Sequence, residues 1–339
     1  MKAMTIAAAL ALSTGAMAAD TTMTLEGRFN YESTEEKNAG VKTTSGTMSG
    51  DFLRLGIGTR LNETVTGKLV LDVLGDSVNS GTNNGFNKFV NEFSLTKSFG
   101  VFSASIGKME IGTGGRQSDV SARDQYLNST WDKTFVTKHT GVAVDYAVMG
   151  VKLNAQYLQQ DASNANSQGA STDKRIMGLK ADASLMDGMI TPVASYHITQ
   201  GDNKTTLIAV GTGVNVAGVA FSADYLMAKS EDYAAQGTDG KLNTMVFEAG
   251  YQIQNFKPFA KYIMETAKNS DVFYTNGSQK AERTAWELGV EFKPVMEEDM
   301  RAHLVYSSGE TKDKASTNYG KIEETTILAG VAFGFDLLK

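Results

Sequence analysis

The sequence predicts one all-β domain, a transmembrane antiparallel up-and-down β-barrel of about sixteen strands. Three features predict it: an export signal, alternating apolar and polar residues, and connections that are short and long in turn. No stretch after the export signal approaches the ~18 apolar residues that a membrane helix needs. A barrel needs no such stretch, because lipid-facing and lumen-facing side chains alternate along each strand.

The first segment, 1–18, has the order of a cleavable signal peptide. Lys2 supplies a short basic region, 4–12 is apolar, and 16–18 (Ala-Met-Ala) is a small-x-small cleavage site. Cleavage there leaves 19–339 as one transmembrane barrel domain. We therefore expect the chain to be exported to the cell envelope, where a soluble β-protein and a membrane barrel are the two possible outcomes.

Period-2 alternation recurs along the mature chain and predicts its strands. In the first strand, Leu25 and Phe29 alternate with Glu26, Arg28 and Asn30. Because boundaries shift by a few residues in such a prediction, a count of roughly 14 to 18 strands fits the pattern. We expect strands near 23–31, 53–61, 69–73, 89–97, 101–108, 141–148, 151–159, 175–185, 189–198, 205–214, 218–228, 242–252, 256–265, 283–293, 300–307 and 324–336.

Short turns and long polar loops alternate between these strands, which is typical of an up-and-down barrel. Short turns are expected at 62–63, 97–100, 148–150, 186–188, 215–217, 252–255 and 294–299. Long loops are expected near 33–49, 75–88, 109–140, 159–174, 229–241, 266–282 and 308–323, with a shorter one at 199–204. The longest of them is 109–140.

The two faces of the strands separate a barrel from a soluble β-sandwich, which also alternates. One face is small and polar with many charges, and such a face is too costly for a dry core but suits a wet lumen. About sixteen strands enclose a barrel too wide for side chains to fill. Aromatic residues on the apolar face gather toward strand ends, as interfacial girdles do: Phe29, Tyr31, Tyr146, Tyr157, Tyr196, Tyr225, Tyr251, Tyr262, Trp286, Phe292 and Tyr306.

Several kinds of chemistry are missing from the sequence. It has no cysteine, and its three histidines, His139, His197 and His303, have no metal-ligand spacing. There is no G-x-S-x-G nucleophile elbow and no basic tract for nucleic acid. We therefore expect no metal, no cofactor, no enzymatic activity and no nucleic-acid partner.

Four stretches resemble, in their order along the chain, the general trimeric porins of Gram-negative outer membranes. The segment 24–28 resembles that family's opening strand, and 52–58 its arginine-glycine hairpin. The segment 98–108 is similar to the strand entering the third loop, and 140–146 followed by 153–157 to the hairpin leaving it. The resemblance implies a homotrimeric outer-membrane pore for passive diffusion of ions and small hydrophilic solutes. It also implies contact with lipid and lipopolysaccharide, and insertion by the outer-membrane assembly machinery.

In that family the third loop folds into the barrel, where its acidic residues face a basic cluster on the wall. The resemblance assigns this constriction loop to 109–140, with candidate residues Glu110, Arg116, Asp119, Arg123, Asp124 and Asp132. Arg28 and Arg54 match the wall's basic positions, and Arg60 and Lys68 share their face. Two departures are visible: the loop lacks the family's Pro-Glu-Phe-Gly segment, and Phe89 and Val90 replace a further arginine on the fourth strand.

Two other functions fit the same sequence. One is a substrate-specific channel for sugars, phosphate or peptides, and the other is a non-conducting structural or adhesive barrel. The formal net charge of −6 favours a weak preference for cations if the barrel conducts.

Overall fold

The computed structural model describes residues 20–38, 40–74, 89–159, 175–201, 204–231, 239–270, 278–295, 298–313 and 321–338. The predicted signal peptide lies outside the described residues, as do the predicted loop at 75–88 and nearly all of that at 159–174. Within the described residues, no helix is long and apolar enough to cross a membrane.

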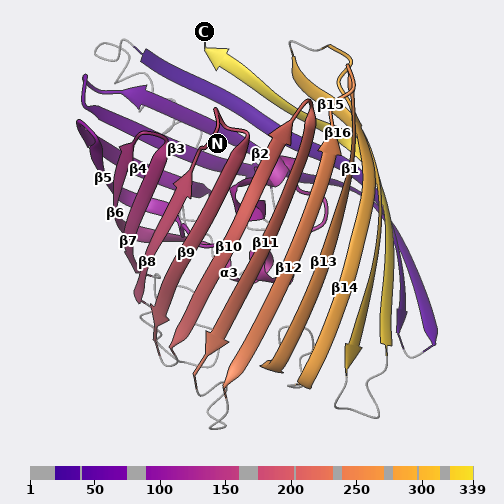
Figure 1. Cartoon of the computed structure of the whole chain (residues 1–339). Coiled ribbons are helices and arrows are strands. Elements are labelled where there is room, and N and C mark those ends of the chain that lie inside the picture. The colour runs from indigo at the N-terminus through magenta and orange to yellow at the C-terminus, as the bar shows by residue number, and fades with distance from the viewer. Residues whose placement is uncertain are drawn as a thin grey trace.

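Sixteen antiparallel strands of the described chain form one closed barrel, as the sequence predicts (Figure 1). Each strand pairs with its neighbours in sequence, and β1 pairs with β16 to close the ring. The strands are β1 (Asp20–Asn38), β2 (Val41–Arg60), β3 (Val65–Leu74), β4 (Val90–Phe99), β5 (Phe102–Glu110), β6 (Lys138–Val148), β7 (Val151–Gln159), β8 (Arg175–Ala183), β9 (Ile190–Gln200), β10 (Thr205–Val216), β11 (Val219–Ser230), β12 (Gly240–Tyr251), β13 (Phe256–Ser270), β14 (Ser278–Phe292), β15 (Asp299–Asp313) and β16 (Lys321–Leu338).

Closure leaves no open sheet edge. In lipid, each unpaired backbone N–H or C=O group costs several kcal/mol, so a spanning sheet must satisfy its edges by closing on itself. The first strand meets the last in register, with Leu25 opposite Phe335 and Arg28 opposite Ala332. The first and last strands are therefore neighbours in the closed ring.

The outward face of the ring is apolar. Trp286, Tyr306, Tyr251 and Phe292, among the aromatics predicted to form girdles, are exposed on this face. Neighbouring strands bring some of them together, and the ring centroids of Trp286 and Tyr306 are 5.4 Å apart. Such a band of exposed apolar side chains is what a β-barrel presents to the hydrocarbon region of a membrane.

The predicted loop at 33–49 is wrong, because this segment continues the first hairpin. β1 runs to Asn38 and β2 begins at Val41, with Glu35 and Lys42 joined by a 2.7 Å ion pair. The segment is polar on both faces, so it lacks the alternation that predicts a strand, yet it is rich in threonine, which favours strands. The loops predicted at 266–282 and 308–323 shorten in the same way: β13 continues to Ser270 and β14 begins at Ser278, while β15 continues to Asp313 and β16 begins at Lys321.

Candidate functional site

The connection between β5 and β6, residues 111–137, holds the short helical segments η2 (Gln117–Asp119), η3 (Ala122–Asp124) and α3 (Thr130–Phe135). Its backbone amides bond to inward-facing side chains of distant strands. The amide of Gly112 donates to Gln156 of β7 at 2.7 Å, and that of Gly114 donates to Ser195 of β9 at 3.1 Å. The connection thus follows the wall of the barrel well beyond its own two strands.

An apolar cluster holds the middle of the connection against this wall. Trp131 of α3 is completely buried, and its ring lies 5.0 Å from that of Phe135. Burying one large apolar side chain contributes about 1.5–3 kcal/mol. Residues of the connection and of the inner face of β7 to β13 form the cluster: Ile111, Trp131, Leu158, Ile176, Leu207, Ala209, Leu226, Ala228, Leu242 and Ala267.

This cluster corrects one expectation from the sequence. The inner face was predicted to be small and polar and to suit a wet lumen, but at Leu158, Leu207 and Leu226 it is apolar and fully buried. Each of these residues lies at an inward position of its strand, where an isolated strand would expose it to water. The connection supplies the missing apolar cover, and the dry region exists because the two surfaces meet.

Asp224 of β11 binds the start of η2. Its carboxylate oxygens accept hydrogen bonds from the backbone amides of Arg116, at 2.7 Å, and Gln117, at 2.8 Å. Amides at the start of a helical turn have no partner within the turn and carry a partial positive charge, so a carboxylate is a favourable acceptor there. Gly115 allows the approach, since a β-carbon at this position would collide with the Asp224 carboxylate.

Glu265 of β13 binds the start of α3 in the same manner. It accepts hydrogen bonds from the Thr130 amide at 2.8 Å and the Thr130 hydroxyl at 2.7 Å, and Arg283 of β14 pairs with it at 2.6 Å. Within the connection, Ser118 donates its hydroxyl to Asp132 at 2.7 Å. Burial raises the pKa of Asp132, and this hydrogen bond acts in the opposite direction.

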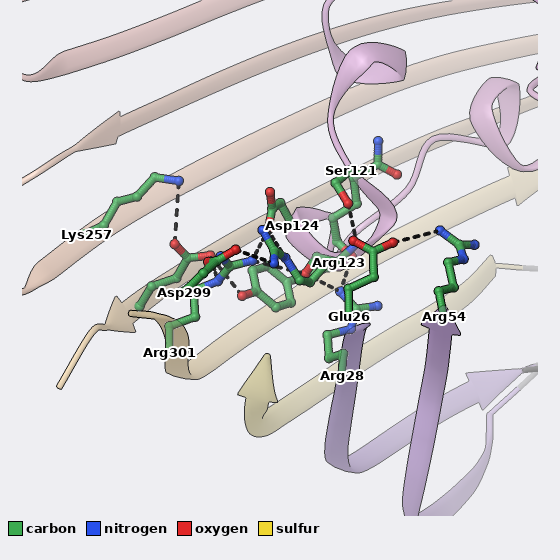
Figure 2. A network of polar contacts seen from close by, with 12 residues as sticks. Glu26, Arg28, Arg54, Ser121, Arg123, Asp124, Lys257, Asp299 and Arg301 are labelled. Atoms are coloured by element: carbon green, nitrogen blue, oxygen red, sulfur yellow. Dashed lines mark hydrogen bonds and ion pairs between the residues drawn. The ribbon is translucent and has the colours of Figure 1, made fainter. Parts of the chain in front are cut away.

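Three guanidinium groups meet where the connection reaches the other side of the ring (Figure 2). Arg28 of β1 donates to the backbone carbonyls of Arg123, at 3.3 Å, and Gln125, at 2.6 Å. Arg123 itself pairs with Asp299 at 2.5 Å, and Arg301 of β15 pairs with Asp124. We call Arg28, Arg123 and Arg301 the arginine cluster.

Small residues on β16 make room for the arginine cluster. Ala332 lies between Arg28 and Arg301 in the register of the sheet, because it is the partner of both. Two residues farther along, a β-carbon at Gly334 would collide with the side chains of Arg123 and Asp299. β16 therefore presents only small residues, Ala332 and Gly334, where the long side chains of its neighbours cross its inner face.

Aromatic rings from the connection and from the wall contact Arg28 of the arginine cluster. The guanidinium of Arg28 lies 5.3 Å from the ring centroid of Tyr126 and 5.9 Å from that of Phe52. Tyr126 donates its hydroxyl to Glu291 of β14 at 2.9 Å and stacks on Phe259 of β13 at 5.4 Å. Burial, and then the neighbouring Glu291 carboxylate, raise the pKa of Tyr126, so its hydroxyl keeps its proton and remains a donor at neutral pH.

A model of the Gram-negative porin family matches residues 5–314 of the chain. The protein belongs to this family. A search of curated protein sequences gave no match. Membership makes the chain an outer-membrane channel for the diffusion of small solutes.

Solved structures with the same fold include porins from several bacteria. The anion-selective porin from Comamonas acidovorans is 14% identical, with 93% of this chain and 100% of that chain covered and a TM-score of 0.67. OmpF of Salmonella typhi, solved with daunomycin, is 14% identical, with coverage of 92% and 97% and a TM-score of 0.63. OmpT of Vibrio cholerae in its trimer form is 15% identical, with coverage of 93% and 99% and a TM-score of 0.62.

Of the candidates in this porin, the structure brings Arg28, Arg123 and Asp124 together. Arg54 lies beside them: its guanidinium is 4.8 Å from the Phe52 ring and pairs with Asp72 at 2.8 Å. These residues come from β1, β2, β3 and the connection.

The other candidates lie elsewhere in the porin. Lys68 pairs with Glu92 on the wall, and Glu110 lies 3.7 Å from Lys138 at the end of β5. Asp119 pairs with Lys180 of β8 and lies 3.4 Å from Arg116. Arg60 is at the far end of β2, exposed and paired with Asp20 at 3.1 Å, apart from the connection. Asp132 faces Ser118 within the connection itself.

Five residues of the site were not predicted from the sequence: Arg301, Glu291, Asp299, Asp224 and Glu265. The alternating pattern of the sequence does place Arg301 and Glu291 on the polar face of their strands, so it could have identified them as lumen-facing. It gives the face of a residue but not its height in the barrel, which depends on the stagger of sixteen strands. Within the described residues, no group of acidic residues and histidines could hold a metal ion.

Proposed function

We propose that ions and small hydrophilic solutes diffuse passively through this porin past a constriction formed by residues 111–137. One observation carries the proposal. The connection bonds to inward-facing side chains on both halves of the ring, from Ser195 of β9 to Arg28 of β1. A segment bonded to opposite walls occupies part of the cross-section and leaves a narrower passage. No catalytic step is part of this function.

The charges beside the constriction support weak rather than strong ion selectivity. The arginine cluster is matched by Asp124, Asp299 and Glu291, each within ion-pair distance of an arginine. Paired charges of both signs orient water and favour polar over apolar solutes, but they cancel much of each other's long-range field. The formal net charge of −6 then favours cations slightly.

Planar-bilayer recording tests the proposal. The purified mature protein should give stepwise conductance in KCl, and the reversal potential in a salt gradient should have the sign of a weak cation preference. Inserted protein without current would reject diffusion in favour of a structural or adhesive barrel. Saturable block by one sugar, phosphate or peptide would favour a substrate-specific channel instead.

We also propose that the mature chain begins after Ala18 and assembles as a homotrimer in the outer membrane. The order of residues 1–18 supports export, and the trimer form of the Vibrio cholerae relative supports the assembly. Lipid, lipopolysaccharide and the assembly machinery are its expected partners. N-terminal sequencing that begins elsewhere than Ala19 would contradict the cleavage, and an unheated gel with only a monomer-sized species would contradict the trimer.

A further inference from the structure

A cavity of about 330 Å³ lies between the connection and the inner wall of β9 to β14. Asn215 and Gly250, among its lining residues, lie one or two residues from the short turns after β10 and β12. Short turns mark the periplasmic end of outer-membrane barrels, so the cavity lies on that side of the connection. Its chemical character is set by Tyr126, Glu248, Phe259, Lys261, Glu287 and Glu291.

One carboxylate of the cavity is incompletely satisfied. Glu287 is 4% exposed, and its Oε2 atom has no hydrogen-bond partner among the described residues. Its neighbour across the strand pair is Lys261, whose ammonium pairs with Glu248 on the opposite side at 2.6 Å. The row formed by Glu248, Lys261 and Glu287 therefore has two carboxylates and one ammonium.

The other bases of the cavity also have acidic partners. Lys257 lies 3.5 Å from Glu291, and Arg116 lies 3.4 Å from Asp119. A buried carboxylate oxygen without a hydrogen-bond partner destabilises the charged group. A cation that enters the cavity would offset this destabilisation at Glu287.

A flat aromatic surface lies beside Glu287 in the cavity, because Phe259 is the register partner of Gly289, two residues from Glu287 on β14. Phe259 and Tyr126 stack with ring centroids 5.4 Å apart and an interplanar angle of 17°. Both rings line the same cavity as Glu287. A carboxylate beside aromatic rings is complementary to an ammonium group with a short hydrocarbon chain.

We propose that this cavity is a subsite for small alkylammonium solutes on their way through the channel. Glu287 binds the ammonium group, and Tyr126 and Phe259 contact the alkyl chain. The inference rests on the proposed diffusion function, because the solute reaches the cavity only through the lumen.

The first test uses three solutes of equal chain length on the mature protein in planar bilayers. Butylammonium should reduce the KCl conductance in a saturable manner, whereas 1,4-butanediol and butyrate at the same concentration should not. Equal effects of all three solutes, or no effect of butylammonium, would overturn the subsite while leaving diffusion intact. Absence of KCl conductance would overturn both.

A variant locates the site. Glu287→Gln keeps the shape of the side chain but removes its charge, and we expect the half-blocking concentration of butylammonium to rise about tenfold. The matched control is Glu310→Gln. Glu310 lies near the C-terminal end of β15, outside the cavity, and pairs with Lys312 and Lys321. Block of Glu287→Gln at the wild-type concentration would place the binding elsewhere and reject the subsite.

Discussion

Arg28 of β1 and Arg301 of β15 are both register partners of Ala332, and the two guanidinium groups approach the same turn of the connection over its methyl group. Two like charges are stable this close because carbonyl and carboxylate oxygens separate them. Arg28 donates to the carbonyl of Gln125, and Arg301 pairs with Asp124 and Glu291. The small residue between them is therefore part of the site.

A larger residue at this position should displace the connection. Ala332 is completely buried, so Ala332→Leu forces side chains into the space of the arginine cluster, at a cost of about 1–3 kcal/mol. We expect a lower midpoint of thermal unfolding and an altered single-channel conductance. Ala329→Leu, at an outward position three residues earlier on the same strand, should change neither, and equal effects of both variants would contradict the prediction.

Asp224 should hold the start of η2 in place. Asp224→Asn keeps one acceptor oxygen but replaces the other with an NH₂ group, which leaves either the Arg116 or the Gln117 amide without its acceptor. Losing such a bond costs about 1–3 kcal/mol, so these amides should exchange hydrogen roughly tenfold faster or more. Exchange measured by mass spectrometry on a peptide covering both amides checks this.

The matched control is Asp145→Asn, since Asp145 bonds to Asn154 within the wall and not to the connection. Unchanged protection of Arg116 and Gln117 in Asp224→Asn would show that Asp224 does not hold the connection.

The two tryptophans should report on opposite surfaces. Trp131, on the connection itself, is fully buried against the wall, whereas Trp286 is exposed on the outward face. In Trp286→Phe the remaining fluorescence should be blue-shifted and resistant to both iodide and brominated lipid. In Trp131→Phe the remaining fluorescence should be quenched by brominated lipid. Iodide quenching of Trp131 would mean that water reaches the apolar cluster.

Burial of Asp132 gives a pH dependence of known sign. Because folding raises its pKa, the folded state binds the proton more tightly than the unfolded state does. This contribution to stability is fully present below the ordinary aspartate pKa of about 4 and is lost as pH rises through the raised value. Relative to Asp132→Asn, the wild type should therefore lose stability as the pH rises from below the ordinary aspartate value through the raised one, as measured by urea unfolding in detergent. A constant difference across this range would contradict the prediction.

The barrel was predictable because one short-range rule describes it. Alternation at a period of two places Leu25 and Phe29 outward and Arg28 inward, and neighbouring strands in sequence are neighbours in the ring. The rule fails where both faces of a strand are polar. The extensions of β1 and β2 beyond the apolar band, such as the Glu35–Lys42 pair, follow from cross-strand pairing that alternation does not detect.

The site was predictable only in part, because its residues come from opposite ends of the chain. The family resemblance selected Arg28, Arg123 and Asp124, which the structure brings together. Their partners Asp299 and Arg301 lie more than 170 residues away in sequence from Arg123 and Asp124. The route of a polar connection depends on such long-range contacts, and no local pattern encodes them.

The position of the seam has a consequence for how the passage forms. The arginine cluster needs β1 and β15, which lie on either side of β16. Until β16 joins β1, the carbonyl groups of Arg123 and Gln125 lack their partner Arg28, although the apolar cluster near Trp131 already has its wall. The connection can thus pack early near Trp131, whereas its contacts near Arg123 are complete only on closure. The narrowest part of the channel is then completed at the seam of the barrel, in the same step that closes the barrel wall.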